Sequence, residues 1–132
     1  MTLERLDHYT IRLRPDDLAA TRRFYVEVLG LAEGDRPAFS FPGHWLYCNG
    51  RPVVHLAGTA TEDRASSTGR IDHIAFQATG LQAMLRHLDE SGISFEQKPV
   101  PGQALHQVFL LDPNGIKIEL NYDAGEAPAG DG

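Results

Sequence analysis

The chain has 132 residues, of which 42% are hydrophobic and 23% charged, and its formal net charge at pH 7 is −6. This composition is typical of one ordinary globular domain with a core of its own. Acidic residues are scattered and Lys and Arg form no block, which argues against nucleic acid or an anionic membrane surface as the main partner. We therefore expect the partner to be a small molecule.

The sequence also bears on the cellular compartment. Its one cysteine, Cys48, cannot form an internal disulfide, and residues 1–5 lack the apolar run of a signal peptide. No stretch approaches the roughly 20 apolar residues that are needed to span a bilayer. These features predict a cytoplasmic protein without a membrane segment.

An internal repeat organises the chain. The phrase Leu6-Asp7-His8 returns as Ile71-Asp72-His73, 65 residues later, and the same offset relates the turn signal Asn49-Gly50 to Asn114-Gly115. Each first phrase opens an apolar, strand-like run, and each turn signal is followed by a short strand-like run. The sequence therefore predicts two similar halves.

Periodicity predicts the order βαβββ in both halves. In the first half we expect a strand at 6–13, a helix that begins at Pro15 and ends near Gly30, and strands at 38–41, 44–48 and 52–57. In the second half we expect a strand at 71–78, a helix at 81–91, and strands at 93–97, 105–111 and 116–122. The prediction is an α+β fold with modules at 1–57 and 70–122, a linker at 58–69 and a flexible tail at 123–132.

Strand alternation places four candidate side chains on the sheet faces that lie away from the helices. Successive side chains point to opposite faces, so the apolar residues of each strand should face the helices, while His8, His55, His73 and Glu119 face away from them. A sheet face away from its helices often meets solvent, and ordinary surface residues are the alternative interpretation. Solvent exposure alone gives no reason for imidazole or carboxylate at related positions of both halves, and these groups suit Zn, Fe, Mn, Ni or Co. We therefore expect a metal site.

Two further residues are candidates for contact with a substrate. Trp45 belongs to an aromatic set with Phe39, Phe41 and Tyr47, which would wall an apolar substrate pocket or else belong to the core or to a dimer interface. His106 begins a predicted strand, where it would serve as an acid or base or lie at a partly exposed edge. We expect both to bind substrate.

Four segments together resemble the vicinal oxygen chelate superfamily, which includes glyoxalases, fosfomycin-resistance proteins and extradiol dioxygenases. They are LDH at 6–8, FYVEVLGL at 24–31, IDHIAF at 71–76 and DPNGIKIEL at 112–120, and the resemblance covers residues 5–122. It implies two βαβββ modules that form a curved mixed sheet around a metal cavity. By resemblance to glyoxalase I, one divalent transition metal would take His8, His55, His73 and Glu119 as ligands.

The chain departs from each specific member of that superfamily. Glyoxalase I commonly has glutamate where this chain has His55, which leaves Glu119 as the base beside the metal. Arg12 resembles an arginine that glyoxalase I uses for the glutathione carboxylate, but Thr59 occupies the place of its asparagine partner. Phe109 occupies the place of a tyrosine that extradiol dioxygenases use for proton transfer.

Three functions remain open. The leading hypothesis is a glyoxalase-like lyase or isomerase whose metal chelates two adjacent oxygens of a small-molecule substrate, with an enediolate-like intermediate and Glu119 as the catalytic residue. The alternatives are an iron(II) dioxygenase of the extradiol type and a metal-free binding protein of the bleomycin-resistance type. By resemblance to small glyoxalase-like proteins, we also expect a homodimer. The linker at 58–69 has the composition and length that would permit the two chains to exchange modules, and the alternative is a chain that pairs its own halves.

Overall fold

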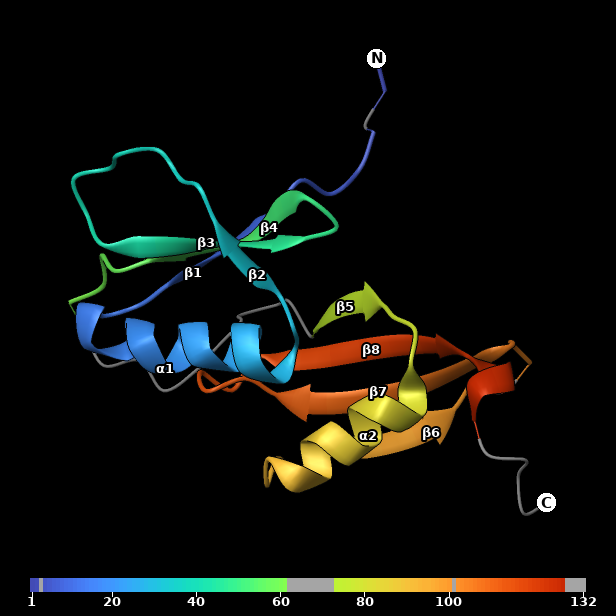
Figure 1. Cartoon of the computed structure of the whole chain (residues 1–132). Coiled ribbons are helices and arrows are strands. Elements are labelled where there is room, and N and C mark those ends of the chain that lie inside the picture. Colours follow the sequence, from blue (N-terminus) through green and yellow to red (C-terminus); the bar gives the residue numbers. More distant parts are fainter. Residues whose placement is uncertain (3, 62–72, 101, 128–132) are drawn as a thin grey trace. The chain divides into compact units, whose positions relative to one another are not determined.

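The computed structural model describes residues 1–2, 4–61, 73–100 and 102–127, and the chain divides into two compact units, Met1–Arg64 and Ala65–Gly132. Each unit contains helical structure and a four-stranded mixed sheet (Figure 1). The predicted α+β fold with two βαβββ-like modules is thus confirmed.

Unit 1 contains the first module. Its elements are β1 (Tyr9–Arg12), the 3₁₀ turn η1 (Pro15–Asp17), α1 (Leu18–Arg23), the π-helical turn η2 (Phe24–Val28), β2 (Ala32–Gly34), β3 (Gly43–Cys48) and β4 (Arg51–Ala57). The strand order is β1-β4-β3-β2, with β1 parallel to β4 and the other neighbours antiparallel. The predicted helix is therefore present as one helical stretch with three local geometries.

Unit 2 repeats this topology. Its elements are β5 (Ile74–Gln77), α2 (Leu81–Glu90), β6 (Glu96–Pro99), β7 (Leu105–Leu111), β8 (Lys117–Asp123) and the 3₁₀ turn η3 (Ala124–Glu126). The strand order is β5-β8-β7-β6, and β5 is parallel to β8. Among the described residues, no helix combines the length and the apolar character that a membrane crossing requires.

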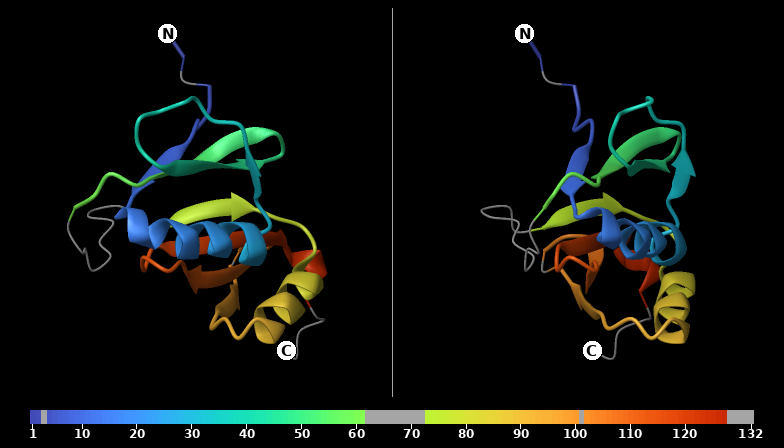
Figure 2. Two further views of the ribbon diagram at one scale, coloured as in Figure 1. Left: turned by 60° about the vertical axis from the view of Figure 1, so that its left-hand side comes forward. Right: turned by 90° about the vertical axis from the view of Figure 1, so that its left-hand side faces the viewer.

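The burial of alternate strand residues confirms the predicted faces. In unit 1 the buried set includes Ile11, Val54 and Leu56, whereas Thr10 and Arg12 on the other face of β1 are exposed. In unit 2, Ile118 and Tyr122 of β8 are fully buried, as are Leu81 and Leu88 of α2. In both views of Figure 2, α1 and α2 each lie on one side of the sheet of their own unit. The apolar face of each sheet therefore forms the core of its unit together with the helix, and the candidate ligands belong to the other face.

One predicted strand is wrong. Residues 38–41 alternate as a strand would, but they lie in the loop between β2 and β3, and the second strand of unit 1 is Ala32–Gly34. The ring of Tyr47 lies so close to Gly34 that a Cβ there would come within 2.7 Å of it, and the Tyr47 hydroxyl donates to the Asp35 carbonyl at 2.5 Å. Glycine at position 34 thus permits the pairing that defines β2.

The start of the predicted tail also requires correction. Asp123 is the last residue of β8, residues 124–126 form η3, and residues 128–132 lie outside the described residues. Glu126 explains why the chain is ordered here, because its Oε1 accepts the backbone N–H groups of Gly80 at 2.9 Å and Leu81 at 3.1 Å. These bonds satisfy N–H groups at the start of α2. Of the predicted linker 58–69, residues 62–69 also lie outside the described residues.

The two repeated turn signals form turns. Asn49 and Gly50 have φ angles of 51° and 78°, which matches the two-residue hairpin turn that Asn-Gly favours. In the second turn, Asp112 Oδ1 accepts the N–H groups of Asn114 and Ile116, each at 2.8 Å. The first turn joins β3 to β4 and the second joins β7 to β8, and β4 and β8 each carry one candidate metal ligand.

A charged cluster in unit 1 gives a pH-dependent prediction. Glu33 of β2 pairs with Arg22 of α1 at 2.5 Å and also with His44 of β3. Partial burial raises the pKa of Glu33, but the bonds from Arg22 and His44 outweigh this effect and lower the pKa below its ordinary value of 4.5. Glu33→Gln should therefore lower the free energy of unfolding at about pH 7, and the deficit should shrink as the pH falls below about 4.5. Urea unfolding at several pH values measures this, and a deficit that does not change with pH would contradict it.

Tyr122 gives the opposite pH dependence in unit 2. Its side chain is fully buried, its hydroxyl has no hydrogen-bond partner among the described residues, and burial, with a smaller effect of Glu126, raises its pKa to about 12. The unfolded chain releases this proton near pH 10, so stability due to Tyr122 is lost as pH rises from 10 to 12. Tyr122→Phe should be at least as stable as wild type at about pH 7, with an advantage that grows toward about 2–3 kcal/mol above pH 12. Thermal unfolding of both proteins across this range tests the difference.

Candidate metal and substrate site

The first pair of candidate ligands lies in unit 1, where three rings stack in a row. His8 immediately precedes β1, and its ring centroid is 3.8 Å from that of His55 on β4, with 14° between the ring planes. The Trp45 indole covers the other side of His55 at 4.0 Å and 9°. Trp45 is the direct neighbour of His55 on the adjacent strand β3. The predicted ligand His55 and the predicted substrate residue Trp45 thus lie in contact.

Hydrogen bonds orient both imidazoles. His8 Nδ1 is 2.7 Å from Asp7 Oδ2, and this bond from His8 lowers the pKa of Asp7 below its ordinary value of 3.8. His55 Nε2 is 2.9 Å from the Pro52 carbonyl oxygen, which can only accept. If Nδ1 of His8 and Nε2 of His55 carry the protons in these bonds, then His8 Nε2 and His55 Nδ1 hold the lone pairs that a ligand can use.

The surroundings of His55 favour its neutral form. Burial lowers its pKa below the ordinary value of 6.5, and the nearby charge of His8 lowers it further. The bond to Pro52 and the charge of Asp7 raise it by less. A neutral imidazole is the form that binds a metal ion, so His55 is ready for ligation at about pH 7 without first losing a proton.

The second pair lies in unit 2. His73 immediately precedes β5, and its Nε2 lies 3.4 Å from Oε1 of Glu119 on β8. The Glu119 residue is only 9% exposed, and its Oε2 accepts from Asn121 Nδ2 at 2.8 Å. Asn121 Oδ1 in turn accepts from Gln107 Nε2 at 3.0 Å. A chain of two amides thus fixes the orientation of the carboxylate.

Strand register shows that the two pairs hold equivalent places. Thr10, two residues after His8, pairs with His55, and Ala75, two residues after His73, pairs with Glu119. The neighbours on the next strand correspond too, because Trp45 pairs with His55 and Phe109 with Glu119. Each unit therefore places one imidazole before its first strand and one donor at the same point of its last strand.

The donor sets fit a divalent transition metal to different degrees. Two donors bound at about 2.1 Å to one tetrahedral ion lie roughly 3.4 Å apart, and the His73–Glu119 separation is 3.4 Å. In unit 1 the stacked rings hold their lone pairs in two nearly parallel planes, so one ring must turn for both to bind one ion. In the described parts of the chain, no group of three or more His, Cys, Asp or Glu side chains is gathered as a metal site.

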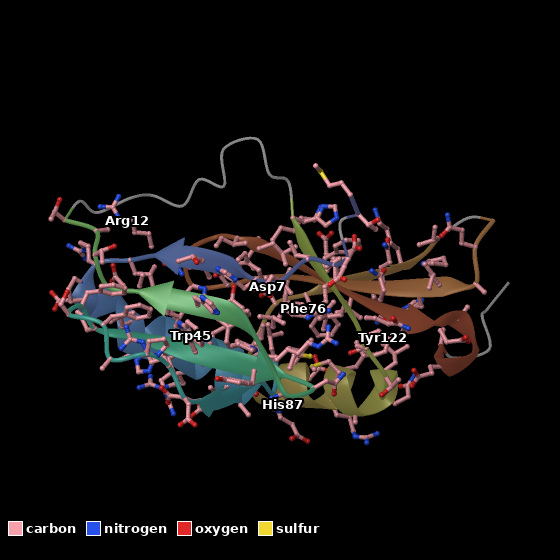
Figure 3. All side chains as sticks on the ribbon, turned by 90° about the horizontal axis from the view of Figure 1, so that it is seen from above. Asp7, Arg12, Trp45, Phe76, His87 and Tyr122 are labelled. Atoms are coloured by element: carbon pink, nitrogen blue, oxygen red, sulfur yellow. The ribbon has the colours of Figure 1, made fainter. Side chains whose placement is uncertain are left out.

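The other predicted residues lie at different places. Arg12 is at the opposite end of β1 from Asp7 (Figure 3), and it donates from Nε to Thr59 Oγ1 at 3.0 Å and from Nη2 to the Thr59 carbonyl at 3.2 Å. Thr59 therefore accepts two hydrogen bonds from Arg12, although glyoxalase I has an asparagine at the corresponding place. His106 is 8% exposed, bonds to Gln97 Oε1 at 2.9 Å, and lies on the face of β7 opposite to Phe109. The structure does not bring His106 together with Glu119.

Sequence reasoning did not identify the amides behind Glu119. Alternation along β8 places Asn121 on the face of Glu119, and this was the available signal. The bond from Asn121 and its link to Gln107 depend on the β7–β8 register, which pairs Gln107 with Asn121. Register between strands that a turn of several residues joins is not readable from alternation alone.

A family model shows where the chain belongs. Residues 5–120 match the model of the "Glyoxalase/Bleomycin resistance protein/Dioxygenase superfamily". The chain belongs to this superfamily. The match spans both βαβββ modules and all four candidate ligands, and it confirms the resemblance drawn from the sequence motifs.

Curated relatives agree with this membership. The chain is 30% identical over 124 residues to "Glyoxylase I 4" of Arabidopsis thaliana, covering 89% of this chain and 70% of that protein. It is 26% identical to a lactoylglutathione lyase of Schizosaccharomyces pombe, and it spans only 48% of that protein's length. The chain is thus a distant relative of glyoxalase I enzymes, and the superfamily also includes proteins that are not enzymes.

Solved structures show the same fold. A Bacillus anthracis protein provisionally assigned to the glyoxalase family has a TM-score of 0.76 at 20% identity, covering 93% of this chain and 98% of that one. A glyoxylase/bleomycin resistance protein/dioxygenase domain from Frankia sp. EAN1pec has a TM-score of 0.72 at 19% identity, covering 92% and 99%. At these identities the likeness establishes the fold alone.

Proposed function

We propose that this chain is a divalent-metal-dependent enzyme that acts on a small molecule with two adjacent oxygens, by glyoxalase-like lyase or isomerase chemistry. The observation that carries the proposal is the equivalent register of His55 and Glu119. Each pairs with the residue two positions after the histidine that precedes the first strand of its unit. His8, His55, His73 and Glu119 would hold the ion. The distant similarity to glyoxalase I and to a lactoylglutathione lyase supports this class of chemistry.

The chain's own residues support defined tasks. When bound, a divalent cation would supply Lewis acidity toward the two adjacent oxygens of the substrate. Glu119 is the group that would accept and return a proton, because it is the single carboxylate among the four candidates and it is nearly buried. Asn121 keeps Oε2 fixed while Oε1 faces His73, so the carboxylate is held in one orientation. Its role is therefore acid–base catalysis in addition to ligation.

The metal content of the purified protein tests the proposal. Protein that is freed of metal and then titrated with Fe, Mn, Co, Ni or Zn should bind about one ion per chain. The absence of stoichiometric binding of all five metals would reject the proposal in favour of metal-free binding. Oxygen uptake with a catechol separates the dioxygenase alternative, for which Phe109 lacks the hydroxyl that extradiol chemistry uses in proton transfer.

A further inference from the structure

A cavity of about 610 Å³ lies in unit 2, at the end of the sheet where β6 and β8 begin and β7 ends. All its lining residues belong to this unit. Its wall combines apolar side chains with one acid and one base, namely Ile93, Phe95, Phe109, Leu111, Glu96 and Lys117. This volume is in the range of small-molecule sites, and mostly apolar walls with a few charged groups are typical of them.

Phe109 in this wall has two ammonium groups beside it. Lys98 Nζ lies 5.1 Å from the ring centroid and Lys117 Nζ lies 4.9 Å from it. The two side chains come from β6 and β8, the strands on either side of β7. They are the only lysines in the sequence. Two like charges beside one ring favour an anion near them, and the ring itself offers an apolar contact surface.

The cavity shares its sheet face with the candidate catalytic carboxylate. Phe109 is the direct neighbour of Glu119 across the β7–β8 pairing, and Lys117 lies two residues before Glu119 on β8. Because strand side chains alternate, Phe109, Lys117 and Glu119 project from the same face. A molecule bound in the cavity against Phe109 and Lys117 would therefore lie on the sheet face that carries Glu119.

We propose that this cavity binds the apolar part of a substrate that also carries a carboxylate, and that the Lys117 ammonium, with Lys98 nearby, holds that carboxylate. As a statement about the substrate it rests on the proposed function, while the binding itself needs no metal. Glu96 is the opposing charge in the same wall and weakens the binding of an anion. The substrate class is thus an aryl or alkyl carboxylic acid with two further adjacent oxygens.

Three probes of similar size and different charge test the charge preference. Metal-depleted wild-type chain is titrated with phenylbutyrate, phenylbutanol and phenylbutylamine, and binding is followed by amide NMR shifts. Phenylbutyrate should bind most tightly and the amine most weakly, with shifts centred on residues 92–96 and 109–117. Binding of the alcohol or the amine as tightly as the carboxylate, or shifts elsewhere, would overturn the inference.

Four variants test the residues. Lys117→Met should weaken phenylbutyrate about fivefold and leave phenylbutanol unchanged, whereas Glu96→Gln should strengthen phenylbutyrate. Arg86→Met, which removes a positive charge from α2 outside the cavity wall, is the matched control and should change neither. Lys117→Arg should retain binding and shows that the charge matters. Unchanged binding in Lys117→Met rejects the assignment, as does an equal loss in Arg86→Met.

Metal titration of the same samples separates this inference from the proposed function. A chain that binds metal but none of the probes rejects the cavity and leaves the metal proposal standing. A chain that binds phenylbutyrate but no metal supports the cavity as a carboxylate site and rejects the metal-dependent function.

Discussion

Glu119→Gln should weaken metal binding at least about 100-fold and abolish turnover. Glutamine has nearly the shape of glutamate and its side-chain oxygen can still accept from Asn121, so the fold of β8 should be preserved. It lacks the negative charge for the ion and the basicity for the proton. Competition with a chromogenic chelator measures the affinity, and the far-ultraviolet spectrum checks the fold.

Neighbouring variants show whether this loss belongs to ligation. His73→Ala should lose affinity as strongly as Glu119→Gln, because its Nε2 is the donor 3.4 Å from Glu119 Oε1. Asn121→Ala should lose about 10- to 100-fold, since it only orients the carboxylate. His87→Ala on α2 is the control and should bind metal as wild type does. Unchanged affinity in Glu119→Gln, or losses of the same size in His87→Ala, would contradict the role of Glu119.

The fold and the candidate ligands were largely predictable because they depend on local periodicity. The 65-residue spacing of His8 and His73 indicates the internal repeat. Alternation along β4 and β8 places His55 and Glu119 on the face opposite to the apolar residues beside them. The chain then needs only the correct pairing of first and last strands to give the equivalent register. The short turn at Asn49-Gly50 makes the β3–β4 pairing local, whereas β1 and β4 pair from opposite ends of the unit's sequence.

The loop between β2 and β3 was not predictable from the same signals. Phe39 and Phe41 alternate with small residues as in a strand, yet their rings stack with their centroids 5.0 Å apart. Arg36 Cζ lies 5.1 Å from the ring centroid of Phe39 and 5.4 Å from that of Phe41. These contacts make the loop a small cluster of its own. Residues 32–34 form the strand that pairs with β3 instead. The Tyr47 ring of β3, which is distant in sequence, packs against Gly34 of that strand.

The ring stack and the helix cap were also beyond sequence reasoning. The contact of His55 with both His8 and Trp45 requires three strands in register and one rotamer for each ring. The bonds from Gly80 and Leu81 to Glu126 join residues 46 and 45 positions apart. Neither the ring stack nor the helix cap follows from the local sequence pattern. Both depend on tertiary packing, which local residue propensities do not specify.

We further propose that the protein is a homodimer, in which each metal site takes its two unit 1 ligands from one chain and its two unit 2 ligands from the other. The resemblance to small glyoxalase-like proteins supports pairing of chains. It is also consistent with the division of the donors, two in each unit. Light scattering should give the mass of two chains, and a monomer by this measurement would reject both the dimer and the exchange.

Complementation tests the exchange itself. When chains with His8→Ala and chains with Glu119→Ala are unfolded and refolded together, an exchanged mixed dimer collects both lesions in one site and leaves the other intact. Random pairing should therefore restore tight metal binding to about one quarter of all sites, although neither variant alone has any. Each variant refolded alone is the control. Without exchange every site keeps one lesion, so a dimer whose mixing never restores tight binding has unexchanged chains, each of which supplies all four ligands to its own site.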